Sequence, residues 1–360
     1  MRILQLIDSL HPGGAERMAI NIANALVGQV EVSALCCTRE EGDLKDQLES
    51  GVRYLFADRK GRLGVRGIWR IIKFVKKHKL THIHAHSSSI YIGFILKCII
   101  PRLHLIWHDH YGNAGFVSQR SIRRYQWMSV KIDVIIAVNK QLQEWALDHK
   151  LSQKVVYLQN FIRPSSNKLV ARKNFLETQS KTVICLANLR PQKNHKLLIK
   201  AWATLKTEYP DWELLLIGKK FQDEYQQMLI DLIKQYGLSQ EVKLLGSVNN
   251  ASVWMDKASI GVLSSSSEGL PLSLLEYGLA GLPVVVTDVG ACREVVGNTS
   301  IVIPAGDLDQ FTHALSRLMS NSALRSNLGQ AFKGRVEAEF GEEKFLQSLL
   351  ELYRSVHDKN

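Results

Sequence analysis

Short apolar runs alternate with helical segments along almost the entire chain, and this alternation limits the possible folds more than any other feature. The strand-like runs of the first half lie at residues 2–7, 30–35, 52–56, 81–84, 103–107, 134–138 and 155–158. Helical patterns separate several of these runs, at 15–26, 66–79 and 90–100. Strands that alternate with helices predict a parallel sheet covered by helices on both faces.

The same succession begins again after a polar break at 163–167, which we interpret as a linker. Its strand-like runs lie at 182–186, 213–217, 242–245, 258–263, 283–287 and 300–303, and its helical patterns at 196–209, 225–236, 272–278, 309–339 and 342–357. A chain of 360 residues has the length of two ordinary domains. We predict two doubly wound α/β domains, at 1–163 and 168–340, with a last helix at 341–360. Ligands of such sheets bind beyond the carboxyl ends of the strands, so we expect the site in the cleft between the domains.

The stretch from Glu268 to Glu276 is the main candidate for a ligand site. It follows an apolar run and four serines, and Pro271 stands where a helix tolerates proline, in its first turn. The predicted strand–loop–helix unit brings backbone N–H groups and the positive end of a helix beside Glu268, which suits a phosphate. Glu276 is able to accept hydrogen bonds from sugar hydroxyls. This pattern fits a nucleotide sugar, while an acidic helix cap and a surface glutamate on an ordinary strand–helix unit explain the spacing equally well.

Two further loops lie where strands are predicted to end. Gly13 and Gly14 occupy the first strand-to-helix turn, where glycines let a ligand approach the backbone, although a plain tight turn is equally compatible. Their spacing is not G-x-G-x-x-G and no acid ends the second strand, so a nicotinamide dinucleotide is not indicated. Arg190 and Lys193 follow the first strand of the second half, a position that suits the neutralisation of a diphosphate, although cations in loops are usually solvated.

Several histidines alternate along two of the predicted strands: His82, His84, His86, His108 and His110. H-x-H spacing is able to bind a metal, but no matching acidic ligands accompany it, so we interpret these side chains as hydrogen-bonded residues of the cleft. Asp307 and Asp309 resemble a metal-binding D-x-D pair, but they open a predicted helix, and capping explains them better. The sequence therefore predicts no metal site.

Basic residues are concentrated in the first half of the chain. Residues 1–165 hold 24 Lys and Arg against 13 Asp and Glu, whereas the remainder holds 22 against 21. Residues 66–79 combine cations with isoleucine, tryptophan and phenylalanine at helical spacing. A basic amphipathic helix of this kind predicts contact with an anionic membrane surface, and a solvated basic helix is the alternative. No nucleic-acid-binding motif is recognisable, so nucleic acid is not an expected partner.

Composition favours a folded protein of the cytoplasm. Hydrophobic residues make up 46% of the chain and charged residues 22%. The first residues do not resemble a signal peptide, and the longest apolar run, 90–100, is too short to span a bilayer. The five cysteines lack C-x-x-C spacing, which indicates neither a disulfide framework nor a zinc site. We expect a cytoplasmic protein that is peripheral at the inner face of the cell membrane.

Taken together, these motifs resemble the retaining nucleotide-sugar glycosyltransferases of family 4, which have the GT-B fold of two Rossmann-like domains facing a central cleft. The segments that carry the resemblance are Gly13–Arg17, Ile83–His86, His108, the Arg190–Lys193 loop, and Glu268-x7-Glu276 followed by Gly281-Leu-Pro-Val-Val. The last segment is the most specific one. The resemblance covers nearly the whole chain.

The resemblance implies a role for each matching residue. Lys193, with an arginine of the same loop, holds the donor diphosphate, while Glu276 accepts hydrogen bonds from the ribose and Glu268 from the sugar. Further implied contacts come from Gly13 and Gly14 beside the diphosphate, His108 facing the transferring sugar, and the backbone of Gly269, Leu270, Pro271 and Leu272. The family's usual arginine is Asn188 here, so Arg190 is the candidate to supply that charge. The acceptor would lie on the basic first domain, and the last helix would cross back onto it.

The implied reaction moves a hexose from a UDP- or GDP-sugar to a hydroxyl of a glycan or lipid-linked acceptor. It retains the anomeric configuration and uses no metal or other cofactor, because positioning and stabilisation of the leaving diphosphate supply the catalysis. Two other functions stay open: a UDP-sugar 2-epimerase-like isomerase on the same fold, and a catalytically silent nucleotide-sugar-binding protein. The isomerase needs acid–base carboxylates that the sequence does not identify, and the intact Glu268, Glu276 and Lys193 count against the silent protein.

Overall fold

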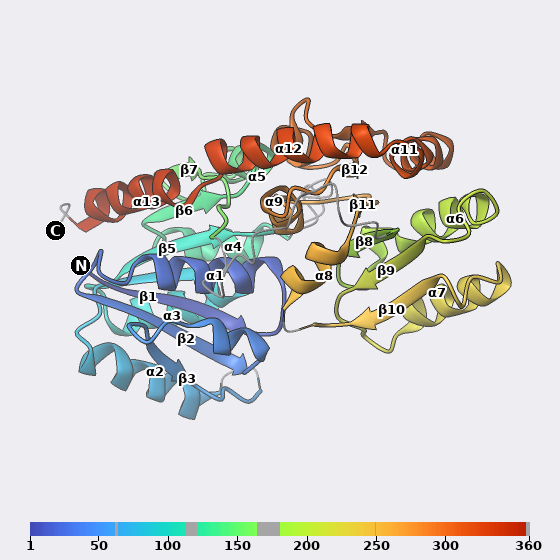
Figure 1. The fold of residues 1–360 in the computed structure, drawn as a ribbon. Helices are drawn as coiled ribbons and strands as arrows, with labels where there is room; N and C mark the ends of the chain where they lie inside the picture. Colours follow the sequence, from blue (N-terminus) through green and yellow to red (C-terminus); the bar gives the residue numbers. More distant parts are fainter. Residues whose placement is uncertain (62–63, 112–120, 164–180, 249, 358–360) are drawn as a thin grey trace. The chain divides into compact units, whose positions relative to one another are not determined.

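The computed structural model describes residues 1–61, 64–111, 121–163, 181–248 and 250–357. The chain divides into two compact units (Figure 1). Unit 1 comprises Met1–Phe161 and Glu342–Asn360, and unit 2 comprises Ile162–Gly341. The predicted linker at 163–167 lies outside the described residues except for Arg163, as does residue 168, where we expected the second domain to begin.

Unit 1 contains a parallel sheet in the strand order β3-β2-β1-β4-β5-β6-β7. Its strands are β1 (Arg2–Ser9), β2 (Val32–Glu40), β3 (Arg53–Phe56), β4 (His82–His86), β5 (His104–Asp109), β6 (Val134–Ala137) and β7 (Val155–Tyr157). Its α-helices are α1 (Gly14–Ala25), α2 (Val65–Lys77), α3 (Ile90–Ile99), α4 (Arg123–Ser129), α5 (Lys140–Asp148) and α13 (Glu342–His357). The last of these, red in Figure 1, returns to unit 1 from the far end of the sequence.

The two faces of this sheet differ in chemistry, because successive side chains of a strand point to opposite faces. One face packs into the apolar core with α2, α3, α4 and α5, and its residues from β4 and β5 are Ile83, Ala85, Leu105 and Trp107. The residues that alternate with these on β4 and near the end of β5 are His82, His84, His86 and His108, and all are buried. This histidine face is covered by α13, whose Tyr353 contacts His82 and His84.

Unit 2 contains a second parallel sheet, in the order β10-β9-β8-β11-β12-β13. Its strands are β8 (Thr182–Leu186), β9 (Glu213–Ile217), β10 (Val242–Gly246), β11 (Ile260–Leu263), β12 (Val284–Thr287) and β13 (Ile301–Ile303). Its α-helices are α6 (His195–Leu205), α7 (Glu224–Gln235), α8 (Ala251–Lys257), α9 (Leu272–Leu279), α10 (Cys292–Val296), α11 (Leu308–Ser320) and α12 (Ser322–Glu339). A short 3₁₀ helix, Pro191–Lys193, precedes α6.

The predicted strand-like runs all overlap strands of the two sheets, and the main differences concern short helices. Four helices were not predicted, and none of them is longer than nine residues: α4, α5, α8 and α10. A helix of two turns shows too few repeats for its apolar spacing to stand out, and packing stabilises it more than propensity does. In the part of the chain that the structure describes, no helix combines the length and the apolar character needed to cross a membrane.

Candidate active site

Glu268 and Lys193 form the centre of the candidate site in unit 2. Glu268 lies in the turn between β11 and α9, with an exposed fraction of only 3%. The Nζ atom of Lys193 lies 2.6 Å from Oε1 and 2.7 Å from Oε2 of this carboxylate, and Ser265 Oγ donates to Oε1 at 2.6 Å. A buried carboxylate needs such partners, because it has lost its hydration. The alternative of an acidic helix cap is therefore wrong for Glu268, and the N-cap of α9 is Pro271.

Hydrogen bonds from Ser264 and Ser266 join the loop of Lys193 to the loop of Glu268. Ser264 Oγ donates to the carbonyl oxygen of Lys193 at 3.0 Å, and the amide of Ser266 donates to the carbonyl oxygen of Gln192 at 2.8 Å. Thr287, at the end of β12, donates through Oγ1 to the carbonyl oxygen of Ser265 at 2.6 Å. The serines, predicted only as part of a polar loop, therefore fix the relative position of the two charged residues.

Helix α9 is held at the carboxyl end of the sheet by Tyr277. Its hydroxyl accepts from the amide of Leu186 at 2.6 Å and donates to the carbonyl oxygen of Ile184 at 3.2 Å, both on β8. Tyr277 is fully buried, and burial raises the pKa of its hydroxyl well above the ordinary value, so it stays protonated. These hydrogen bonds of Tyr277 fix the position of α9. The same helix carries half-buried Glu276, four residues after its first residue, Leu272. Tyr277 was missed in the sequence, where an apolar helix position gave no sign of this contact.

The backbone of Glu268 and Gly269 is closely approached by Gly290. The amide of Ala291 donates to the carbonyl oxygen of Gly269 at 2.9 Å. Gly290 has φ +55°, and a Cβ atom there would lie 2.2 Å from the carbonyl oxygen of Glu268. Only glycine fits both conditions. Gly290 therefore supports the candidate loop from the turn after β12, a role that the sequence analysis did not identify.

Arg190 does not join Lys193 and Glu268 in the structure. Its guanidinium carbon lies 3.6 Å from the centre of the Phe221 ring, an arrangement in which a cation is attracted by the aromatic face. Asn188, which stands where the family arginine was expected, accepts through Oδ1 from the amide of Lys219 at 2.8 Å. The loops after β8 and β9 are thus linked, and Lys219 is a further cation beside Phe221 that the sequence analysis did not single out.

The glycine pair of unit 1 lies where α1 begins, next to the carboxyl end of β1. Gly13 is the N-cap of α1, and as a glycine it has no side chain to cap this helix end. A Cβ atom added to Gly14 would meet nothing within 4 Å, and one added to Gly13 would lie nearest the flexible carboxylate of Glu16. The backbone at Gly14 is therefore open on its own unit, as the predicted approach of a ligand requires.

His108 is fully buried near the end of β5, on the histidine face of unit 1. Its Nδ1 lies 3.1 Å from Nε2 of His84, while its Nε2 makes no hydrogen bond to any described residue. Burial lowers the pKa of His108 well below the ordinary value and that of His84 to about 3, so both rings are neutral at pH 7. The prediction that the strand-end histidines are hydrogen-bonded is confirmed.

Two groups of three histidines have ring nitrogens within 4.8 Å of one another: His84, His86 and His108, and His82, His104 and His357. In both groups ring nitrogens already take part in hydrogen bonds, such as that of His82 Nδ1 to Thr81 Oγ1 at 2.8 Å. Neither group contains a carboxylate to balance a divalent ion. The aspartate pair has another role, because Asp307 caps α11 by accepting from the amide of Gln310 at 2.9 Å, which confirms the predicted cap.

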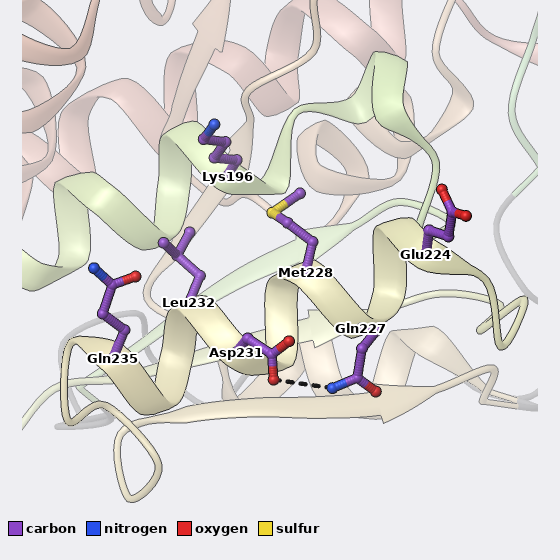
Figure 2. A pocket seen from close by; sticks show the side chains of 7 residues that line it. All are labelled: Lys196, Glu224, Gln227, Met228, Asp231, Leu232 and Gln235. Atoms are coloured by element: carbon purple, nitrogen blue, oxygen red, sulfur yellow. Dashed lines mark hydrogen bonds between the residues drawn. The ribbon is translucent and has the colours of Figure 1, made fainter.

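A hollow between α6 and α7 on unit 2 is a separate feature (Figure 2). It is lined by Lys196, Glu224, Gln227, Met228, Asp231, Leu232 and Gln235. Gln227 donates through Nε2 to Asp231 Oδ1 at 2.9 Å, so part of its polar lining is engaged on the helix itself. None of the predicted site residues lines the hollow, and its charges of both signs do not converge on one point, so we assign no ligand to it.

Two family models cover most of the chain. Residues 12–166 match the model described as glycosyltransferase family 4, and residues 166–335 match the model described as glycosyl transferases group 1. The chain belongs to the glycosyltransferases. Its candidate site in unit 2 lies inside the group 1 match, and the glycine pair and His108 lie inside the other.

This glycosyltransferase is similar to known proteins along nearly its full length. It is 23% identical over 348 residues to an uncharacterized glycosyltransferase of Haemophilus influenzae. The aligned residues cover 93% of this chain and 94% of the relative. It is also 23% identical over 363 residues to the amylovoran biosynthesis glycosyltransferase AmsD of Erwinia amylovora, covering 96% and 97%.

Solved structures show the same architecture. Anabaena HepE in complex with UDP-glucose superposes with a TM-score of 0.79 at 19% identity, covering 99% of this glycosyltransferase and 100% of that chain. Sucrose-phosphate synthase from Thermosynechococcus elongatus superposes with a TM-score of 0.78 at 17% identity, covering 100% of both chains. These likenesses and the two parallel sheets confirm the predicted GT-B fold.

Proposed function

We propose that the protein transfers a hexose from a nucleotide diphosphate sugar to a hydroxyl acceptor, with retention of the anomeric configuration. The observation that carries the proposal is the contact of Lys193 with the buried carboxylate of Glu268 at the loop before α9. Lys193 and Glu268, held side by side, suit the two parts of a nucleotide sugar. The lysine ammonium matches the anionic diphosphate, and the carboxylate accepts hydrogen bonds from the hydroxyl groups of the sugar.

Unit 2 is the proposed donor-binding unit. Lys193 neutralises the diphosphate, Glu268 accepts from hydroxyls of the sugar, and Glu276 accepts from the ribose. Gly269 and Leu272 offer backbone N–H groups for the phosphate and sugar, while Leu270 and Pro271 shape the loop. Anabaena HepE has been solved in complex with UDP and with UDP-glucose, which supports a nucleotide sugar as donor. We propose a UDP- or GDP-sugar.

The proposed mechanism is a front-face displacement. The bond from the anomeric carbon to the diphosphate breaks first and an oxocarbenium-like centre develops. The acceptor hydroxyl then attacks from the side of the leaving group, and its proton passes to the departing diphosphate oxygen. The residues of the chain act by stabilising charge that grows on the diphosphate, a form of catalysis that needs donors already in position. Lys193 supplies one charge, and Arg190, from the same loop, is proposed to supply the other. No metal takes part in this scheme.

Unit 1 is proposed to bind the acceptor and to complete the donor site. Gly13 and Gly14 give the diphosphate access to the backbone, and His108 faces the transferring sugar. The names of similar proteins point to glycan or lipid-linked acceptors, since they include amylovoran biosynthesis in Erwinia amylovora and lipopolysaccharide core biosynthesis in Rhizobium leguminosarum. The acceptor is therefore proposed to be a polysaccharide or lipid-linked intermediate.

We also propose that α2 brings the protein to an anionic membrane surface on the cytoplasmic side. The helix buries Gly67, Ile71 and Val75 and exposes Trp69 and Val65, with exposed fractions of 55% and 72%. Its exposed cations are Arg66, Arg70, Lys73, Lys76 and Lys77. Exposed aromatic and aliphatic side chains among cations are typical of helices that bind the headgroup layer.

Product analysis tests the proposed reaction. The purified protein is incubated with UDP-, GDP- and ADP-sugars and with lipid-linked or oligosaccharide acceptors, in the presence and absence of EDTA. We expect one nucleotide class to give a glycosylated acceptor and free nucleoside diphosphate, with the anomeric configuration of the donor and without sensitivity to EDTA. A sugar nucleotide with altered ring stereochemistry would instead indicate the isomerase, and binding without turnover of any acceptor would indicate the silent protein.

A further inference from the structure

A continuous series of hydrogen bonds runs across the histidine face of unit 1 and involves α13. Two bonds lie on the side of His86, whose Nδ1 is 3.0 Å from His110 Nε2 and whose Nε2 is 2.8 Å from Gln5 Oε1. Two lie on the side of His84, whose Nδ1 is 2.5 Å from the Tyr353 hydroxyl and whose Nε2 is 3.1 Å from His108 Nδ1. Gln5 Nε2 joins the two sides by donating to the Tyr353 hydroxyl at 3.4 Å.

The orientation of the Gln5 amide, with Nε2 toward Tyr353 and Oε1 toward His86, sets the direction of every bond on the side of His84. An amide nitrogen donates and cannot accept, so the Tyr353 oxygen accepts from it. Among the described residues, His84 Nδ1 is then the acceptor placed to take the single Tyr353 proton. A neutral imidazole that accepts at Nδ1 carries its proton on Nε2, which His84 therefore donates to His108 Nδ1. Because His108 accepts this bond at Nδ1 and its ring is neutral, His108 carries its own proton on Nε2.

The two hydrogen bonds of His86 are consistent with the same orientation of the Gln5 amide. The Gln5 carbonyl oxygen only accepts, so His86 carries its proton on Nε2 and accepts at Nδ1 from His110. The rule holds only for neutral rings, and burial keeps them neutral. It lowers the pKa of His84 and of His110 to about 3, and those of His86 and His108 well below the ordinary value.

We propose that Gln5 and Tyr353, acting through His84, hold His108 in the tautomer with its proton on Nε2, so that His108 presents one N–H donor to an oxygen of the bound sugar. His108 Nε2 is fully buried and has no hydrogen-bond partner among the described residues, so a ligand oxygen would satisfy it. Tyr353 is then a positioning residue that α13 supplies to the proposed transferase site. The catalytic part of this inference rests on the proposed function, but the tautomer does not.

If these hydrogen bonds only stabilised the fold, it would not matter which nitrogen of His108 carried the proton. The series instead ends in a buried donor, His108 Nε2, that has no partner among the described residues, and such a donor costs stability unless a ligand compensates it. Metal binding by His84, His86 and His108 is the competing explanation for the same rings. A metal would have to take nitrogens that now bond to Gln5, Tyr353 or one another, so the two arrangements exclude each other.

Nitrogen-15 NMR of histidine-labelled full-length protein tests the tautomer without any substrate. The two neutral tautomers give different shifts at Nδ1 and Nε2, and replacing His108 by Gln assigns its signals. We expect a pure Nε2–H form for His84 and His108 in the wild type. Tyr353→Phe and, separately, Gln5→Met should each give His108 as a mixture of tautomers, while Tyr209→Phe, which removes a hydroxyl bonded to Ser316 in unit 2, should leave it pure. A proton on His108 Nδ1 in the wild type, or one bound zinc per chain by elemental analysis, would overturn the inference.

Kinetics then test the positioning role. We expect Tyr353→Phe to lower kcat about fivefold, the scale of one hydrogen bond, with little change in the KM for the donor. The same substitution in a His108→Ala background should cost nothing more, because its effect passes through His108. A pure Nε2–H tautomer together with equal losses in both backgrounds would refute positioning through His108. Absence of transferase activity in the wild type, with the tautomer as expected, would refute the proposed function and leave the hydrogen-bond assignment standing.

Discussion

Lys193 and Glu268 stand 75 residues apart in the sequence, but their side chains meet at 2.6 and 2.7 Å. Glu268 is almost fully buried, whereas Lys193 keeps part of its surface exposed. The lysine can therefore turn toward a ligand phosphate more easily than the carboxylate can move. Ser265 remains on Glu268 in that case and continues to hold the carboxylate in place.

Removing either charge should abolish most of the proposed activity. We expect Glu268→Ala and Lys193→Ala each to reduce kcat roughly a hundredfold, the scale of one lost electrostatic contact to the transition state. Lys181→Ala is the matched control, because it removes an exposed ion pair to Asp211 at 2.8 Å on the same unit. Steady-state kinetics and melting temperatures of all three variants separate catalysis from folding. Activity near that of the wild type in both site variants would contradict the assignment.

The position of Arg190 over Phe221 makes a separate prediction. A planar guanidinium stacks on an aromatic ring better than an ammonium group does, so Arg190→Lys should lose nearly as much activity as Arg190→Ala, about tenfold. Phe221→Leu should give a smaller loss, because the guanidinium is less well oriented. Arg293→Ala, which removes an exposed ion pair to Asp288, serves as the control. If Lys219→Ala loses activity and Arg190→Ala does not, the second charge comes from Lys219.

Three histidines of unit 1, the buried His82 and His84 and the partly exposed His110, should not titrate in the physiological range. Burial lowers the pKa of His82, His84 and His110 to about 3, below the ordinary value of about 6.5. Between these values the unfolded chain binds protons that the folded chain does not, so the free energy of unfolding falls as the pH falls from about 6.5 toward 3. Proton NMR of the imidazole rings between pH 5 and 8 should show no titration of these three. A midpoint near pH 6.5 for any of them would contradict their burial.

Contact of α2 with an anionic membrane is tested with vesicles. Each cation near such a surface contributes about 1 kcal/mol, so Lys76→Gln should weaken binding to phosphatidylglycerol vesicles about fivefold. Trp69→Ser should weaken it further, because this exposed ring, with the Lys73 ammonium 3.4 Å from its centre, is placed to enter the headgroup layer. Lys234→Gln on α7 is the control for total charge. Equal binding to neutral and anionic vesicles would indicate that α2 is a solvated basic helix.

Much of the fold could be predicted because buried parallel strands leave a simple signal. Runs such as 182–186 and 213–217 are apolar at every residue after the first, and the observed β8 and β9 have these bounds. Part of the site was equally accessible, since the Glu268 stretch joins a buried strand to a helix that starts with proline. The face on which each histidine lies also follows from alternation along β4 and β5.

The rest of the site depends on contacts that no local pattern records. Tyr277 was an apolar helix residue in the sequence, but its hydroxyl reaches the backbone of β8, 91 residues earlier in the chain. Tyr353 likewise meets His84 across 269 residues. The stacking of Arg190 on Phe221 depends on how the loops after β8 and β9 meet, and spacing within one loop carries no information about the other. Side-chain partners between distant segments are set by tertiary packing.

Gly290 offers a test of how closely the candidate loop is held. Gly290→Ala forces a side chain onto a residue with φ +55° and brings its Cβ to 2.2 Å from the carbonyl oxygen of Glu268, so the loop must move. Gly306→Ala is the matched control, because Gly306 also has positive φ, +82°, while a Cβ there would meet nothing within 4 Å. Both variants should lose about 1 to 3 kcal/mol of stability from strain, but only Gly290→Ala should also lose activity, by at least tenfold. Melting temperatures and kcat measured side by side decide the matter: equal activity in the two variants would mean that the position of the Glu268 loop does not limit the reaction.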